Sequence, residues 1–387
     1  NQDGFNLYLN SVNGTMAGRK IEATYADDRF QADVGLTKAK ELVESQGAKV
    51  LMGITPTPEG YAIAPYVRDQ KVPTLITGNA GGLGMTTDAK YKSPYLVRFT
   101  QTGTEINDPA ADWAVKQGYK KAVLISSDFA PGIQNTDYFA SVFVGGGGSV
   151  IQEMHPAVGT TDFGPFLAKL DQSADVIYGF LPGVDGLRFL QQYRDYAGQS
   201  KAQIIDAFGT IAAGHNLEQE GDKALGVVGV DIFTSAATYP ATQGFLKAWQ
   251  QSFGGRLFTH DAAMGYVGAQ ILEAALKKVN GNIEDTQAFM NAIYQTSFDS
   301  AMGPIKLDDT HDVVRNIYIY RVVKQGSTYG QELVQTYQDV SDTWDRTQQQ
   351  VDQFPAGQLK DKWVGMTKEK LQQVPSCASG CAKAGGG

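Results

Sequence analysis

Thr55, Thr57 and Pro58 lie where the sequence predicts that a strand passes into a helix. The strand is expected over residues 50–52 and the helix over residues 59–69, from their apolar spacing. Backbone N–H groups at a helix start carry partial positive charge, and together with two hydroxyls they suit a carboxylate. The alternative is that Thr57 only caps the helix.

Asn79, Ala80 and Gly81 follow the next predicted strand, Val72–Thr77. Their small side chains would let a ligand approach the backbone closely. A ligand is therefore one interpretation of this loop, and a plain glycine-rich turn is the other.

Three phenylalanines stand at or just beyond the ends of later predicted strands: Phe129, Phe180 and Phe208. Ligands of open parallel sheets bind beyond the carboxyl ends of the strands, so these rings could form the walls of an apolar site. Each ring could equally serve core packing.

No catalytic or metal-binding pattern emerges. The histidines are too scattered in sequence to suggest metal ligands; they are His155, His215, His260 and His311. The sequence also lacks a G-x-S-x-G elbow, and Gly145–Gly148 lacks the Lys of a phosphate loop. The acid pairs Asp27-Asp28 and Asp308-Asp309 suit solvated turns, with a hydrolase as the remote alternative. We expect no catalytic residue, no metal site and no cofactor.

The composition is that of a globular protein of two domains: 387 residues, 42% hydrophobic and 19% charged. Its net charge of −8 disfavours nucleic acid as a partner. No apolar run reaches the roughly 18 residues that span a bilayer. We expect an exported chain from which a leader has been removed. Cys377 and Cys381 form either a small local disulfide or two free thiols.

Strands and helices alternate through most of the sequence, which predicts an α/β fold with parallel sheets. Besides those above, the predicted strands are 20–25, 121–126, 150–154, 175–180, 203–206, 227–233, 304–307 and 316–323. The further predicted helices are 34–45, 108–117, 132–143, 163–170, 185–196 and a helical region over 241–293. The amphipathic segment Gly4–Val12 has no strand before it, so the first strand of the sheet is expected to lie outside this sequence. After Asp339 the composition predicts an arm that wraps the surface and then frays.

An ordered set of segments carries a family resemblance: Gly4–Leu9, Gly18–Ile21, Asp27-Asp28, Lys40–Val43, Val72–Thr77, Asp162-Phe163, Tyr266 and Gly303–Ile305. In this order the sequence resembles the branched-chain amino acid type of periplasmic binding proteins, the Leu/Ile/Val-binding family of ABC importers. The resemblance implies a type I periplasmic binding fold, with two Rossmann-like lobes, three hinge crossings and a ligand cleft between the lobes. The crossings are expected near 100–102, 231–234 and 307–309. Lobe 1 is then 1–101 with 232–308, lobe 2 is 102–231 with 309–340, and the arm is 341–387.

The resemblance also implies a function. We expect a non-enzymatic, periplasmic solute-binding protein that closes on a small molecule and delivers it to the membrane permease of an ABC importer. Whether a lipid anchors it before processing stays open. A ligand-sensing receptor or regulator of the same fold is the alternative.

The family's site maps onto Thr55, Thr57 and Pro58, onto Asn79–Gly81, and onto Phe129, where amino acid binders often carry Tyr. The family's acid for the ligand ammonium falls at or beside Phe208. Asp206, two residues away, is the candidate to serve in its place, although a two-residue offset along a strand need not aim it into the cleft. An ammonium in a closed cleft needs a carboxylate or several acceptors, because an unpaired buried charge is costly. This departure counts against a simple leucine binder. The expected ligand is a small apolar or aromatic carboxylate, with Phe129, Phe180 and Phe208 as candidate walls, or a branched-chain-type amino acid.

Overall fold

The chain folds into two units, each built from two stretches of sequence. The computed structural model describes residues 1–82, 84–196, 200–212, 214, 216–256, 258–375 and 377. Unit 1 comprises Asn1–Thr102 and Ala237–Asn316, and unit 2 comprises Gly103–Ala236 and the chain from Ile317 onward. The chain therefore passes from one unit to the other after Thr102, Ala236 and Asn316.

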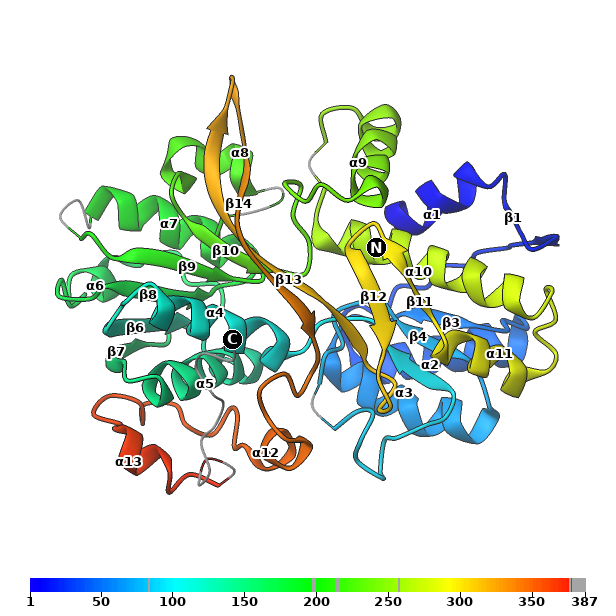
Figure 1. Cartoon of the computed structure of the whole chain (residues 1–387), viewed down its shortest axis with the longest axis horizontal. Coiled ribbons are helices and arrows are strands. Elements are labelled where there is room, and N and C mark those ends of the chain that lie inside the picture. The colour runs from blue at the N-terminus through cyan, green and yellow to red at the C-terminus, as the bar shows by residue number, and fades with distance from the viewer. Residues whose placement is uncertain are drawn as a thin grey trace. The chain divides into compact units, whose positions relative to one another are not determined.

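Unit 1 holds a three-stranded parallel sheet in the order β3-β4-β5, of which β3 and β4 are labelled in Figure 1. Its strands are β1 (Thr15–Met16), β2 (Arg19–Lys20), β3 (Leu51–Gly53), β4 (Thr74–Ile76), β5 (Leu96–Arg98), β11 (Ser297–Ser300) and β12 (Gly303–Leu307). Its helices are α1 (Gln2–Ser11), α2 (Ala32–Lys40) with a π-helical turn (Glu41–Ser45), α3 (Thr57–Gln70), α9 (Pro240–Phe253), α10 (His260–Lys278) and α11 (Thr286–Tyr294). The apolar face of α3, with Ile63, Ala64 and Val67, packs into one core with Ile76 and Leu96 of the sheet.

Helix α1 lies directly on α10, and two glycines make this possible. A Cβ on Gly4 would lie 1.8 Å from the carbonyl oxygen of Ala262, and one on Gly265 would lie 1.9 Å from that of Asn1. Any side chain at either position would push the two helices apart.

The strand predicted over 20–25 is wrong for most of its length. Only Arg19–Lys20 is a strand, β2, which pairs with β1, and residues 21–28 have no regular structure. A strand needs a neighbour to pair with its backbone groups. A cavity, described below, separates this segment from β3, which explains why no ladder forms.

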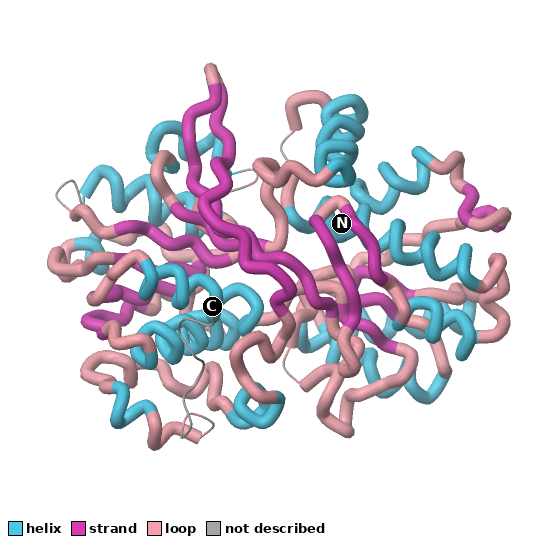
Figure 2. The backbone as a smooth tube through the Cα atoms, in the orientation of Figure 1, coloured by secondary structure: helices cyan, strands magenta, loops and turns pink. Residues whose placement is uncertain are grey.

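Unit 2 holds a parallel sheet in the order β10-β9-β8-β6-β7, with β13 antiparallel to β10. Its strands are β6 (Lys121–Ser126), β7 (Ser149–Met154), β8 (Val176–Phe180), β9 (Gln203–Ala207), β10 (Val228–Asp231), the later part of β13 (Val313–Gln325) and β14 (Thr328–Val340). Its helices are α4 (Gly103–Lys116), α5 (Ala130–Gly145), α6 (Gly164–Leu167), α7 (Val184–Tyr196), α8 (Asn216–Glu220) with a 3₁₀ turn (Gly221–Ala224), α12 (Gln348–Gln353) and α13 (Lys368–Leu371). β14 runs beside β13 in a long ribbon (Figure 2).

The arm after Asp339 packs on unit 2 through buried polar contacts. Arg346 donates two hydrogen bonds to Asp108, at 2.5 and 2.8 Å, and both side chains are fully buried. Further along, the indole of Trp363 donates to Asp137 at 2.6 Å. Cys377 is disulfide-bonded, and Cys381 lies outside the described residues.

The observed unit boundaries differ from the predicted lobe boundaries by one to eight residues. Residues 309–316, predicted in lobe 2, belong to unit 1, because Val313, Val314 and Arg315 pair with β12.

No helix among the described residues combines the length and the hydropathy that a bilayer crossing requires.

Candidate functional site

The loops after β3 and β4 touch each other at the carboxyl edge of the unit 1 sheet. A Cβ on Gly78 would lie 2.9 Å from the hydroxyl oxygen of Thr55, and one on Gly82 would lie 2.3 Å from the Cγ2 of Thr57. The structure therefore brings together the two loops that the sequence singles out in this half of the chain.

Thr57 is the first residue of α3 and does not cap it. The N-cap is Pro56, and no side chain makes a cap hydrogen bond there. The capping interpretation of Thr57 is therefore wrong. Thr55 and Thr57 are half-buried and Pro58 is exposed, so two hydroxyls flank the positive end of a 14-residue helix.

The backbone of the Asn79–Gly81 loop is held in place by its neighbours. Asn79 donates to Asp261 at 2.7 Å and accepts from Gln101 at 3.0 Å. The side chain of Ala80 is fully buried, and a Cβ on Gly81 would lie 2.1 Å from the carbonyl oxygen of Gln101. Any ligand contact by Ala80 or Gly81 would thus come from backbone atoms.

Glu59 lies behind these loops, near the start of α3, and is only 5% exposed. Burial raises the pKa of this carboxyl to about 8, and the Asp28 side chain raises it further, while a hydrogen bond from the Thr55 N–H lowers it. Glu59 is therefore mostly protonated at pH 7, and it places little negative charge beside the Thr55 and Thr57 hydroxyls.

In unit 2, the rings of Phe129, Phe180 and Phe208 form one cluster at the carboxyl ends of β6, β8 and β9. Phe129 stacks on Phe180, with ring centroids 6.1 Å apart and an interplanar angle of 23°. Phe180 meets Phe208 edge to face at 5.5 Å. All three residues are only half-buried, so the cluster presents aromatic surface instead of filling the core.

Asp206 points into its own loop. Its carboxylate accepts the N–H of Ile211 at 2.9 Å and of Ala212 at 2.8 Å, and the hydroxyl of Thr210 at 3.2 Å. The residue is fully buried, and burial raises its pKa to about 7 against the opposing effect of these hydrogen bonds. Asp206 therefore fixes the loop that carries Phe208, and both of its oxygens accept hydrogen bonds within that loop.

Several residues that support these loops are not evident from the sequence. Thr210 accepts from the N–H of Leu181, and Asp185 accepts from the Ser127 hydroxyl, so the loops after β6, β8 and β9 are linked.

Ile54 and Phe208, each just beyond a strand end, have backbone φ angles of 66° and 60°. Such left-handed backbone is costly for residues with large side chains, and it tends to occur at functional loops.

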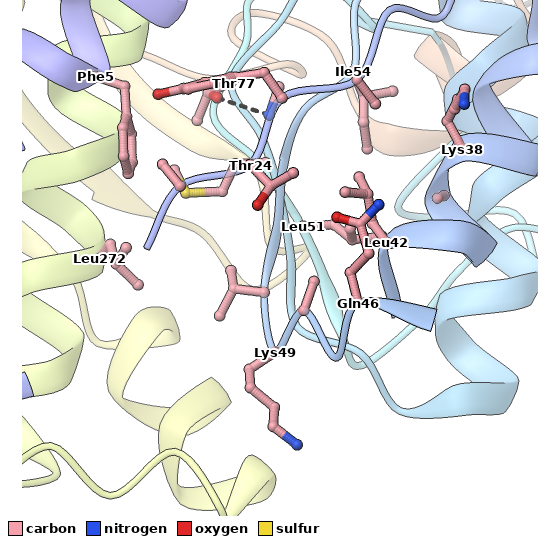
Figure 3. A pocket seen from close by; sticks show the side chains of 18 of the residues that line it. Phe5, Thr24, Lys38, Leu42, Gln46, Lys49, Leu51, Ile54, Thr77 and Leu272 are labelled. Atoms are coloured by element: carbon pink, nitrogen blue, oxygen red, sulfur yellow. Dashed lines mark hydrogen bonds between the residues drawn. The ribbon is translucent and has the colours of Figure 1, made fainter. Parts of the chain in front are cut away.

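A cavity of about 600 Å³ opens in unit 1 between residues 19–26 and the free edge of β3 (Figure 3). Its walls are mixed, because the aliphatic side chains of Leu42, Leu51 and Leu272 lie beside polar ones such as those of Lys38 and Gln46. Ile54 and Thr77 lie at one end and Lys49 at the other, so the cavity runs along the strand edge. It reaches the Thr55 loop but does not include Thr57 or the Asn79–Gly81 loop.

The acid pairs serve as turn acceptors. Asp27 and Asp28 each accept a backbone N–H two residues on, and Asp308 accepts those of Thr310 and Asp312. Of the histidines, His311 stacks on Tyr294, and His215 lies outside the described residues.

Comparisons with known proteins give a consistent result. A family model described as "Periplasmic binding protein" matches residues 1–327. The chain is 27% identical to Leu/Ile/Val-binding protein homolog 6 of Brucella melitensis over 346 residues, which covers 88% of this chain and 87% of that protein. An ABC transporter substrate-binding protein from Sphaerobacter thermophilus has a similar structure, with TM-score 0.82, 29% identity, and coverage of 87% of this chain and 92% of that one. A solute-binding protein of an ABC transporter from Rhodopseudomonas palustris BisB5, in complex with 3,4-dihydroxybenzoic acid, also has a similar structure. Its TM-score is 0.80 and its identity 31%, and the match covers 88% of this chain and 93% of that one.

Proposed function

The chain belongs to the periplasmic binding protein family and is an extracytoplasmic solute-binding protein of the ABC transporter type. From this premise we propose that its ligand is an aromatic carboxylate of the benzoate class. The proposal places the protein in the periplasm, where it would hand the ligand to the permease of an importer.

The observation that carries the proposal is the cluster of Phe129, Phe180 and Phe208. Three half-buried rings at adjacent strand ends offer both faces and edges to a planar aromatic ligand. An α-amino acid would also need an acid or several other acceptors for its ammonium group. Asp206, the acid nearest in sequence to the family position, is fully buried and already accepts three hydrogen bonds. An aromatic acid without an ammonium group avoids this requirement.

The carboxylate of the ligand is assigned to the loops of unit 1. The Thr55 and Thr57 hydroxyls and the start of α3 offer donors and a favourable dipole. The mostly neutral state of Glu59 at pH 7 removes a repulsive charge from their vicinity. Ligand contacts made only in the bound form would favour that form over the free form, as a binding receptor requires. The R. palustris relative, crystallised with 3,4-dihydroxybenzoic acid, supports the same ligand class.

Isothermal titration calorimetry and thermal shift test the proposal with benzoate, 4-hydroxybenzoate and 3,4-dihydroxybenzoate against leucine, isoleucine and valine. We expect an aromatic acid to bind in the micromolar range or tighter and to raise the melting temperature, because it binds only the native state. Binding of a branched-chain amino acid, with none of the benzoates, would contradict the ligand class but leave the receptor function intact.

A matched pair of variants tests the site itself. Phe180→Leu keeps an apolar side chain but removes the ring, and we expect about a tenfold loss of affinity, equivalent to ~1.4 kcal/mol. Phe166→Leu is the control, because Phe166 is also half-buried in unit 2 but packs on Phe163, away from the cluster. Equal effects of both substitutions would show that the cluster does not bind the ring.

A further inference from the structure

Glu153, His155 and Asp361 gather at one place in unit 2, although more than 200 residues separate Asp361 from the other two. Glu153 lies near the end of β7, His155 follows that strand, and Asp361 belongs to the C-terminal arm. One ligand atom from each of the three residues lies within 4.8 Å of the others.

The imidazole Nε2 of His155 is aimed into this cluster without a hydrogen bond. It lies 3.5 Å from an oxygen of Glu153 and 3.9 Å from an oxygen of Asp361. The His155 side chain is 5% exposed, and Nε2 is a buried atom with no hydrogen-bond partner among the described residues. Buried polar atoms are usually satisfied by protein, ordered water or an ion, and here two carboxylates face the same atom, which favours an ion.

The distances fit a shared metal ion better than direct hydrogen bonds. Nitrogen and oxygen ligands bind Zn²⁺ at about 2.0–2.2 Å, so two ligands of one tetrahedral ion lie about 3.4 Å apart. The separation of 3.5 Å from Glu153 is close to this value, and the exposed Asp361 needs only a small rotation to reach it.

The surrounding contacts orient the ligands. The other ring nitrogen of His155, Nδ1, lies 3.1 Å from the buried hydroxyl of Ser126. If Nδ1 donates to this hydroxyl, the Nε2 lone pair faces the carboxylates. Glu153 is held by the N–H groups of Asp361 and Trp363, at 2.9 and 2.7 Å. Such outer contacts are what a metal site uses to fix its ligands.

We propose that Glu153, His155 and Asp361 bind a divalent transition-metal ion such as Zn²⁺, which fastens the C-terminal arm to the end of β7. One imidazole and two carboxylates suit Zn²⁺ or Co²⁺, with water completing the coordination. A divalent ion would neutralise the charges of the two carboxylates, whereas the neighbouring arm cation, Lys360, pairs with Asp128 at 2.7 Å. The spacing of the histidines in the sequence gave no sign of this site, since the third ligand comes from the arm.

The test uses the untagged full chain, freed of metal with chelator under non-reducing conditions so that Cys377 stays disulfide-bonded. Titration with Co²⁺ followed by visible absorption, and with Zn²⁺ by calorimetry, should show one site with Kd below about 10 µM. Asp361→Asn and His155→Gln should each weaken binding at least tenfold, and Zn²⁺ should protect the arm from limited proteolysis only in the unsubstituted protein.

Lys360→Gln is the matched control, because it removes the ion pair one residue away and leaves the three ligands intact. It should bind the metal as the unsubstituted protein does. Because Asp361 is exposed, its variant will fold even if the His155 variant does not. Absence of a site of this affinity, or binding that Asp361→Asn leaves unchanged, would overturn the proposal.

Discussion

Glu220 in α8 is a buried acid whose substitution gives a quantitative prediction. It is 4% exposed, and neither of its carboxyl oxygens has a hydrogen-bond partner among the described residues. Burial raises its pKa to about 9, and the nearby Asp206 carboxylate adds to this effect. The native state therefore keeps Glu220 protonated at neutral pH, whereas the unfolded chain ionises it near pH 4.5.

The sign and size of the effect follow from this difference. A group with a raised native pKa contributes full stability below its unfolded pKa, and that stability is lost as the pH rises toward the native pKa. Between pH 5 and 9 the loss is about 1.4 kcal/mol per pH unit, which reaches ~3 kcal/mol at pH 7. Glu220→Gln removes the ionisation, although its buried amide costs about 1–3 kcal/mol at every pH.

We therefore expect the unfolding free energy of Glu220→Gln, relative to the unsubstituted protein, to rise steadily from pH 5 to pH 9. Urea unfolding at several pH values, followed by tryptophan fluorescence, measures it, because Trp113, Trp344 and Trp363 all lie in unit 2. Glu218→Gln, an exposed acid in the same helix, should run parallel to the unsubstituted protein. If the Glu220→Gln difference does not change with pH, the assignment of a protonated buried acid is refuted.

Three further predictions concern the arm and the two loop sets. Arg346→Met should lower the unfolding free energy of unit 2 by about 3–5 kcal/mol, because it leaves Asp108 buried and unpaired. In the same urea experiment, the double variant that also carries Asp108→Asn should recover part of this loss. Gly81→Ala should weaken binding of the aromatic acid at least tenfold by calorimetry, because the added Cβ would displace the loop from Gln101, whereas the exposed Gly244→Ala should have no effect. Phe208→Gly should lower ligand affinity and at the same time relieve about 1 kcal/mol of backbone strain. A melting temperature that falls together with the affinity would contradict this prediction.

The sequence predicts the parallel sheet of unit 2 closely. β6 has its predicted bounds, and β7, β8 and β9 differ from theirs by one residue at one end. These strands are short apolar runs bounded by turn residues and buried in the sheet, so composition and burial agree. β14 gave no comparable signal, because much of its length is exposed and its residues alternate imperfectly. The strand at 20–25 failed for a different reason, since its pattern is suitable but no neighbouring strand pairs with it.

The candidate site was predictable only as far as loop positions. The carboxyl ends of parallel strands meet at one edge, and there the loops after β3 and β4 do approach each other, as do the rings of Phe129 and Phe180. The direction in which each side chain points was not predictable. Whether Thr57 caps its helix depends on a φ, ψ choice at Pro56, and the grouping of Asp361 with His155 depends on how a polar arm crosses unit 2.

Asp206 has a local hydrogen-bonding role that its position in the sequence does not indicate. The loop after β9 turns sharply through Phe208 at φ 60° and Gly209 at φ 62°, which leaves the N–H groups of Ile211 and Ala212 facing inward. Buried N–H groups must find acceptors, and a carboxylate two residues before the turn satisfies both. The same contact fixes the backbone that holds the Phe208 ring against Phe180. A carboxylate used in this way holds the Phe208 ring in place, and an ammonium group would have to compete with these hydrogen bonds for it. This competition is one reason for proposing a ligand without an ammonium group.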